Sequence, residues 1–211
     1  MALERDHGDQ EDQAALTPRG HFHDIVDRAT KIILTPTTEW DVAAGEDTGV
    51  SDVFYGYVLI LAVIPPLATL IGYSLIFGQI NFGFALIAAI FQYSLSLVAI
   101  FFVAMVTQWL APKFGGLDDL TQAMKLVAYA HTATWLGGIL FLVPGLSFIS
   151  LAFAIYGIYL LYLGVTPVMA IPPERAITYT GAVVLTVFVT FFLLSMIMAI
   201  FFGLSAVGLM V

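Results

Sequence analysis

Five long apolar stretches constrain this chain more than any other feature of its sequence. They cover residues 53–77, 82–110, 122–143, 146–164 and 176–202. A helix needs roughly 20 apolar residues to cross the hydrocarbon core of a bilayer, and each stretch meets or approaches that length. Only 10% of the residues are charged, which excludes a water-soluble enzyme. We therefore predict an all-α, polytopic membrane protein, a bundle of five transmembrane helices preceded by a cytoplasmic amphipathic helix.

Charged residues are distributed unevenly along the chain. Residues 1–52 contain four basic and twelve acidic residues, and residues 53–211 contain three of each. If every apolar stretch crosses the membrane, all Lys and Arg residues lie on the side of the N-terminal segment. The positive-inside rule then predicts a cytoplasmic N-terminus and a C-terminus outside. Because no basic block is present, we exclude nucleic acid as a partner.

The segment before the first apolar stretch divides into two parts. Residues 1–20 are acidic and lack periodicity, so we predict a disordered tail. Residues 21–52 form a cytoplasmic or interfacial segment, because apolar residues between positions 22 and 33 recur at helical spacing. Such a helix either lies in the headgroup plane or packs on cytoplasmic loops. Thr35 and Pro36 are suited to begin a second helix, and residues 53–211 form the membrane domain.

Three side chains are candidates for contacts at the membrane interface. Trp40 has an apolar ring and an N–H group that requires a partner, which suits the headgroup region. Lys125 lies near the cytoplasmic end of its stretch, so its ammonium group can extend to lipid phosphates. Arg175 lies in the cytoplasmic loop before the last stretch. We predict that all three contact the interface.

Pro65 and Pro66 interrupt the first apolar stretch. Each proline removes a backbone donor, so the helix should kink there. The kink serves helix packing, or it acts as a hinge or lines a pore.

The third stretch carries the most polar residues within the membrane domain. His131 lies about two turns deeper than Lys125, and an ionisable group at that depth is a candidate proton carrier or polar contact. The alternative is a neutral imidazole that is hydrogen-bonded to Thr or Tyr on an adjacent helix. Tyrosines at steps of three in the fourth stretch lie on nearly one helical face, where they pack the bundle or form a track for a lipid headgroup. The candidate polar site comprises Tyr129, His131, Thr134, Tyr156, Tyr159 and Tyr162.

We find no spacing typical of a catalytic, cofactor or metal site. His7, His21 and His23 match no metal-ligand motif. The chain has no cysteine, which excludes a thiol nucleophile and a disulfide framework. We predict no metal and no cofactor.

Several segments resemble the Yip-domain family of Ypt-interacting proteins and their bacterial relatives. The resemblance rests on VAYAHTATWLGGILFLVPGL at residues 127–146, YGIYLLYLGV at 156–165, PPERA at 172–176 and KIILTPTTEWDVAAGE at 31–46. The family implies five spans with a cytoplasmic N-terminus. Its eukaryotic members are implicated in vesicle trafficking and bind small GTPases of the Rab type. This chain lacks the DLYGP-like motif of those members. The residues that match the family pattern are Pro36, Glu39, Trp40, Tyr129, Pro144, Gly145, Tyr156, Gly157, Tyr159, Tyr162, Gly164, Pro167 and Tyr179.

Two hypotheses for function follow from the sequence. The first is a non-enzymatic membrane protein of the Yip-domain family, which acts through lipid or protein contacts at the cytoplasmic face and whose small-residue and aromatic surfaces permit a homo-oligomer. The second is a small transporter or lipid-moving protein with a path around His131 and the tyrosine face. An enzyme is the weakest alternative, because one intramembrane histidine does not supply a catalytic constellation.

Overall fold

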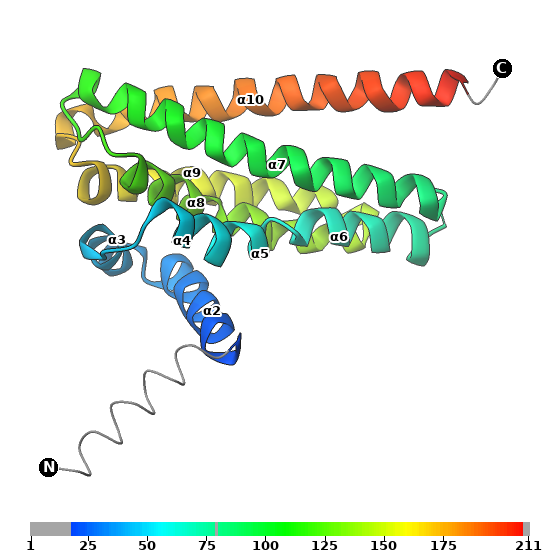
Figure 1. Ribbon diagram of the computed structural model, residues 1–211, viewed down its shortest axis with the longest axis horizontal. Coiled ribbons are helices and arrows are strands. Elements are labelled where there is room, and N and C mark those ends of the chain that lie inside the picture. Colours follow the sequence, from blue (N-terminus) through cyan, green and yellow to red (C-terminus); the bar gives the residue numbers. More distant parts are fainter. Residues whose placement is uncertain (1–17, 79, 209–211) are drawn as a thin grey trace, which may run out of the picture.

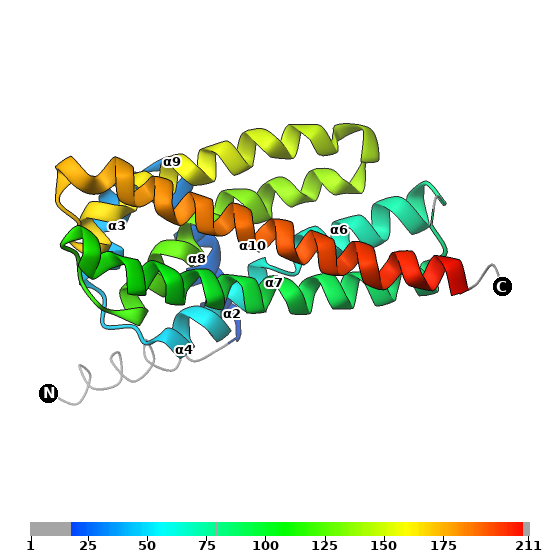
Figure 2. The ribbon, with the colours of Figure 1, turned by 90° about the horizontal axis from the view of Figure 1, so that it is seen from above.

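The structure is a computed structural model that describes residues 18–78 and 80–208, and its described elements are all helical. Long helices lie side by side in a bundle, and two N-terminal helices pack against its flank near one end (Figures 1 and 2). The predicted disordered tail falls mostly at residues 1–17, outside the described residues. The first described helix begins at Pro18, within the last three residues of that predicted segment.

The N-terminal helices are α2 (Pro18–Leu34) and α3 (Pro36–Gly45). The first membrane helix is built from several pieces: α4 (Val50–Val53), η1 (Phe54–Val58), α5 (Leu59–Leu61), α6 (Ile64–Leu70) and η2 (Ile71–Ile76). Then follow α7 (Phe82–Leu110), η3 (Ala111–Phe114) and α8 (Leu120–Gly137). A hairpin of η4 (Gly138–Leu142) and η5 (Pro144–Ile149) leads to α9 (Ser150–Met169), and α10 (Pro173–Gly208) ends the described chain.

Four helical segments of the described chain are long and apolar enough to cross a membrane: Val50–Ile76, Phe82–Phe114, Pro144–Met169 and Pro173–Ile200. They correspond to four of the five predicted apolar stretches, which confirms a polytopic all-α architecture. The remaining stretch, residues 122–143, contains most of α8 and does not reach the same hydropathy. The lower hydropathy of α8 is consistent with its central position in the bundle.

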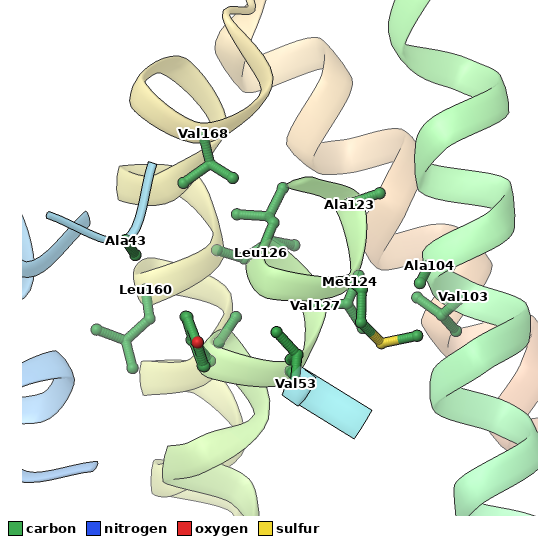
Figure 3. Packing of buried hydrophobic residues seen from close by; sticks show 14 of the residues in the cluster. Ala43, Val53, Val103, Ala104, Ala123, Met124, Leu126, Val127, Leu160 and Val168 are labelled. Carbon is green, nitrogen blue, oxygen red and sulfur yellow. The ribbon is translucent and has the colours of Figure 1, made fainter. Parts of the chain in front are cut away.

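The α8 helix occupies the centre of the bundle. All eight residues from 123 to 130 are buried, so both faces of the helix contact protein. Figure 3 shows Leu126 of α8 among side chains of neighbouring helices, including Val103 of α7 and Leu160 of α9. By contrast, most apolar side chains of α7 and of α10 up to residue 200 are exposed or half-buried, as expected of helices that face lipid. A helix surrounded by protein can carry polar residues that a lipid-facing helix cannot.

Pro65 and Pro66 lie at the start of α6, where the helix has been interrupted at residues 62–63. Proline is tolerated in the first turn of a helix because the N–H groups there have no intrahelical partner. Pro65 packs against Gly138, where an added Cβ would lie 2.6 Å from the proline ring. The predicted break is therefore present and is packed against η4, whereas its role as a hinge stays a prediction.

We expect Gly72→Ala to destabilise the bundle because two backbones meet at this position. An added Cβ would contact the carbonyl oxygen of Phe141 and lie 2.6 Å from that of Leu142. Backbone atoms cannot move aside as a flexible side chain can, so we expect the free energy of unfolding to fall by about 1–3 kcal/mol. Thermal unfolding in one detergent measures the change. Gly181→Ala on α10 is the matched control, because its Cβ would meet nothing within 4 Å; equal melting temperatures would refute the close approach.

Candidate functional site at the capped end of the bundle

Helices α2 and α3 form a cap, defined here as residues 23–46, on the side of the bundle near the end where α4 and α8 begin (Figure 1). Thr35 separates the two helices, and Pro36 begins α3. This agrees with the helix start predicted from the Thr-Pro pair. Ile25, Ala29 and Ile32 are buried, so the apolar face of α2 packs against the bundle. Helix α2 therefore packs on the helices α3 and α8, and its position in the headgroup plane stays a prediction.

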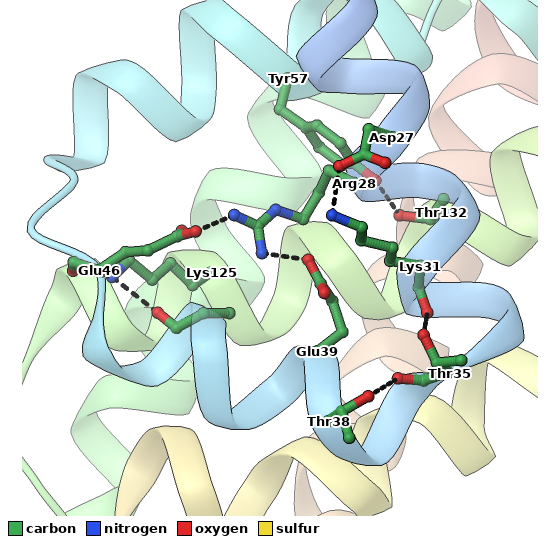
Figure 4. A network of polar contacts seen from close by, with 11 residues as sticks. Asp27, Arg28, Lys31, Thr35, Thr38, Glu39, Glu46, Tyr57, Lys125 and Thr132 are labelled. Atoms are coloured by element: carbon green, nitrogen blue, oxygen red, sulfur yellow. Dashed lines mark hydrogen bonds and ion pairs between the residues drawn. The ribbon is translucent and has the colours of Figure 1, made fainter.

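Arg28 of α2 links both ends of α3 through ion pairs. Its guanidinium donates to Glu39 over 2.5 Å and also to Glu46 (Figure 4). Its carbon Cζ lies 5.3 Å from the centre of the Tyr129 ring, within the range of a cation–π contact. Burial lowers the pKa of Arg28, but the hydrogen bond and charge of Glu46 outweigh it and leave that pKa raised. The guanidinium is therefore charged at any physiological pH.

Lys125 caps the C-terminal end of α3. Its Nζ donates to the carbonyl oxygens of Ala43 over 3.0 Å and Glu46 over 2.6 Å. The last carbonyl groups of a helix lack intrahelical partners, and a cation near them is also stabilised by the helix dipole. Gln122, on the same helix as Lys125, donates to the carbonyl of Ala44 over 3.2 Å. The start of α8 thus supplies the donors that end α3.

Trp40 projects from α3 toward α8 and α9. Its side chain is completely buried. A Cβ on Gly164 of α9 would lie 2.7 Å from the indole, so only glycine leaves room for the ring. The rings of Trp40 and Tyr129 are 6.2 Å apart, and the Tyr129 ring meets that of Tyr57 edge-on at 5.0 Å. Tyr57 in turn is hydrogen-bonded to Thr132 over 2.6 Å.

The Yip1 domain family model matches residues 30–195 of this chain, from within α2 to within α10. This chain belongs to the Yip1 domain family. It is similar to the inner membrane protein YohC of Escherichia coli strain K12 and to the protein of that name in strain CFT073. The identity is 25% over 158 residues, which cover 70% of this chain and 81% of each relative. No solved structure matches the chain.

The Yip1 domain includes α3 and its contacts with α8 and α9, because the family match begins before Pro36. Trp40 and Lys125, which we predicted to contact the membrane interface, are both completely buried in it. That prediction is corrected for these two residues. A snorkelling lysine and an interfacial tryptophan require a surface position, but Lys125 lies beneath the end of α3 and Trp40 points from α3 into the bundle. Arg175, the third candidate, is exposed in the first turn of α10.

The predicted polar site is divided between different environments in the Yip1 domain. Tyr129 belongs to the aromatic cluster under the cap. Tyr156 donates to the carbonyl of Ile33 over 2.6 Å and so holds the end of α2. Tyr159 and Tyr162 are exposed on the outer face of α9. Thr134 lies at the contact of α8 with Gly157 of α9.

His131 hydrogen-bonds within its own helix. Its Nδ1 lies 2.9 Å from the carbonyl oxygen of Val127, and its ring lies 5.9 Å from that of Trp135. No hydrogen bond within residues 18–78 and 80–208 joins it to a Thr or Tyr on another helix. The predicted hydrogen bond from His131 to Thr or Tyr on an adjacent helix is therefore replaced by a bond to the backbone of its own helix. A role for His131 in proton transfer stays a prediction.

Sequence reasoning missed the pairing of Arg28 with Glu39 and Glu46. The available signal was weak: an arginine on the polar face of α2, followed by an excess of acids between residues 39 and 52. Charges on a short polar segment normally contact water, so the sequence gave no reason to place these inside the protein.

We expect Arg28→Leu to release α3 from the bundle. The substitution leaves the nearly buried Glu39 carboxylate without its cation, and we expect a loss of about 1–3 kcal/mol in the docking of α3. Amide hydrogen exchange over residues 36–46 measures this loss as faster exchange. Lys31→Gln is the control, because Lys31 pairs with Asp27 on the exposed face of the same helix. Unchanged exchange in Arg28→Leu would show that the ion pairs do not hold the cap.

Proposed function

We propose that this protein is a non-enzymatic, five-span protein of the bacterial inner membrane that acts through lipid or protein contacts at the cytoplasmic face, in a role of membrane organisation or trafficking. The observation that carries the proposal is the position of the charges. Within residues 23–78 and 80–200, every charged side chain belongs to the cap, to the loops beside it, or to helical turns at the same end of the bundle. Over these residues, only that end offers a surface for recognition by charge.

The central helix α8 is the span that completes the count of five. It runs beside α9 between the capped end and the hairpin at the other end (Figure 2). Its polar residues pack against other helices rather than lipid, which explains why hydropathy alone does not identify it. With five crossings, α10 ends on the side opposite the cap, as drawn in Figure 1.

The cap is suited to contacts rather than to catalysis. Arg28, Glu39 and Glu46 neutralise one another, and Lys125 is held by backbone carbonyls. These groups are therefore engaged in structure instead of being free for proton transfer. The outer surface of the cap exposes Leu34 and Val42, which gives a partner or the headgroup region apolar side chains to contact. The name of the E. coli relatives, inner membrane protein, supports the proposed location.

The transport hypothesis has less support from the arrangement of its residues. His131 bonds its own helix, Tyr156 holds α2, and Tyr159 faces outward. A path would need these groups to line one hydrated space. We therefore keep the contact function as the proposal.

We expect opposite accessibility of cysteines at the two ends of the bundle. The chain has no cysteine of its own, so a single introduced thiol is labelled without background. Gly45→Cys and Gly145→Cys are matched positions, both with open space around an added Cβ. A membrane-impermeant maleimide should label Gly145→Cys in intact cells, and Gly45→Cys only after permeabilisation. Labelling of both in intact cells would contradict the orientation.

We expect a photo-crosslinking side chain at Val42 on the cap to capture a protein or a lipid headgroup in native membranes. The same probe at Phe148 is the control, because Phe148 is exposed at the opposite end. Mass spectrometry of the adducts should show species at Val42 that are absent at Phe148. If Val42 captures neither protein nor lipid, or the same species as Phe148, the proposed function is wrong.

A further inference from the structure

Among residues 23–78 and 80–200, two cationic side chains have no anionic partner and no hydrogen bond. Arg28 and Lys31 are ion-paired, and Lys125 donates to backbone carbonyls. The side chains of Lys113 and Arg175 form no ion pair and no hydrogen bond within the described part of the chain. Both are exposed, so their charges are available to a ligand.

The fold brings these two cations to one corner of the capped end. Lys113 lies in η3, and its Nζ is 2.8 Å from the centre of the Trp109 ring. Arg175 lies in the first turn of α10, and its Nη1 would be 3.8 Å from a Cβ on Gly115, two residues after Lys113. The corner is held together by Tyr179 of α10, which donates to the carbonyl of Thr107 over 2.7 Å.

The corner lies where the apolar surface of the bundle ends. Trp109 is 63% exposed and Ile177 is 72% exposed. Side chains of this kind remain exposed where lipid covers them, and tryptophan favours the headgroup level. Arg175 precedes Ile177 by two residues, or about 3 Å of helical rise. In a bilayer that covers Trp109 and Ile177, the two cations would lie at the depth of the lipid phosphates.

The three acidic groups near this corner have other interactions: two accept hydrogen bonds, and the third lies at a helix N-terminus. Asp118 accepts from the Gln108 amide over 2.8 Å, and Asp119 caps the N-terminus of α8 by accepting from Thr121. Glu174 lies in the first turn of α10, where the helix dipole favours a carboxylate. None of the three forms an ion pair with Lys113 or Arg175 among the described residues.

We propose that Lys113, Arg175 and Trp109 form a binding site for an anionic phospholipid, with the two cations on its phosphate-bearing headgroup and the indole beside its upper acyl chains. A phospholipid fits because it carries negative charge directly above apolar chains, and the corner presents cations directly above exposed apolar side chains. An acidic protein segment would match the cations but not the apolar surface below them. The inference deepens the proposed function, since it names the lipid class contacted at this face.

Fluorescence quenching tests the site directly. Trp40 and Trp135 are buried, so a lipid with brominated acyl chains quenches chiefly Trp109, and Trp109→Phe gives the background. The full chain is reconstituted in phosphatidylcholine vesicles with a small fraction of brominated phosphatidylglycerol or brominated phosphatidylcholine. We expect the anionic lipid to be preferred by roughly tenfold at low salt, because each basic group near a membrane surface adds severalfold attraction. The preference should fall as salt rises.

Three variants assign the preference to this corner. Lys113→Gln with Arg175→Gln should abolish it, whereas Lys113→Arg with Arg175→Lys should keep it. Lys31→Gln removes a cation elsewhere on the same face and should also keep it. All these residues are exposed, and near-ultraviolet circular dichroism verifies that each variant is folded.

Equal quenching of the unaltered chain by both lipids would overturn the proposal. So would a preference that survives in the double glutamine variant. These outcomes are separate from the test of the proposed function, because crosslinking at Val42 reports on the cap and not on this corner. A protein captured at Val42 without a lipid preference at Trp109 would keep the function and refute the lipid site.

Discussion

Lys125 is buried at the start of α8, and two backbone carbonyls at the end of α3 accept hydrogen bonds from its ammonium group. A buried ammonium group without such partners would be strongly destabilising. The lysine therefore requires α3 to stay docked, and the last carbonyls of α3 require a donor in return. Arg28 extends the same logic to α2 by pairing with acids at both ends of α3. The cap and the central helix thus stabilise each other.

This dependence explains how a helix as polar as α8 can lie within a membrane bundle. Its neighbours α7 and α9 cover its sides, and the cap covers its charged end. The more apolar α7 and α10 face outward. Polar residues therefore concentrate at the centre of the bundle and at its capped end, whereas apolar residues lie on its outside. Among residues 23–78 and 80–200 the charged side chains lie at one end only, and this is the end at which we propose recognition.

Much of the fold could be predicted from the sequence, and much of the site could not. The apolar stretches, the break at Pro65, the start of α3 and the family resemblance all follow from local patterns. Trp40 and Lys125 were predicted as surface contacts because their types favour the interface, yet both are buried. Trp40 is buried because Gly164, on a helix more than a hundred residues away in sequence, leaves room for its indole. No local pattern encodes such a pairing.

The sequence by itself determined that this chain is a polytopic helical membrane protein of the Yip1 domain family, with its charges gathered beside the N-terminal segment. Hydrocarbon excludes charge and unpaired backbone groups, so long apolar stretches leave few other structures open. Only the tertiary structure decided which charges neutralise one another and which stay free. Arg28 and Lys113 are both single basic residues near apolar segments. Packing places two carboxylates beside Arg28, whereas it places Lys113 against the exposed ring of Trp109. That difference depends on which helices become neighbours, and neighbours are set by the bundle as a whole.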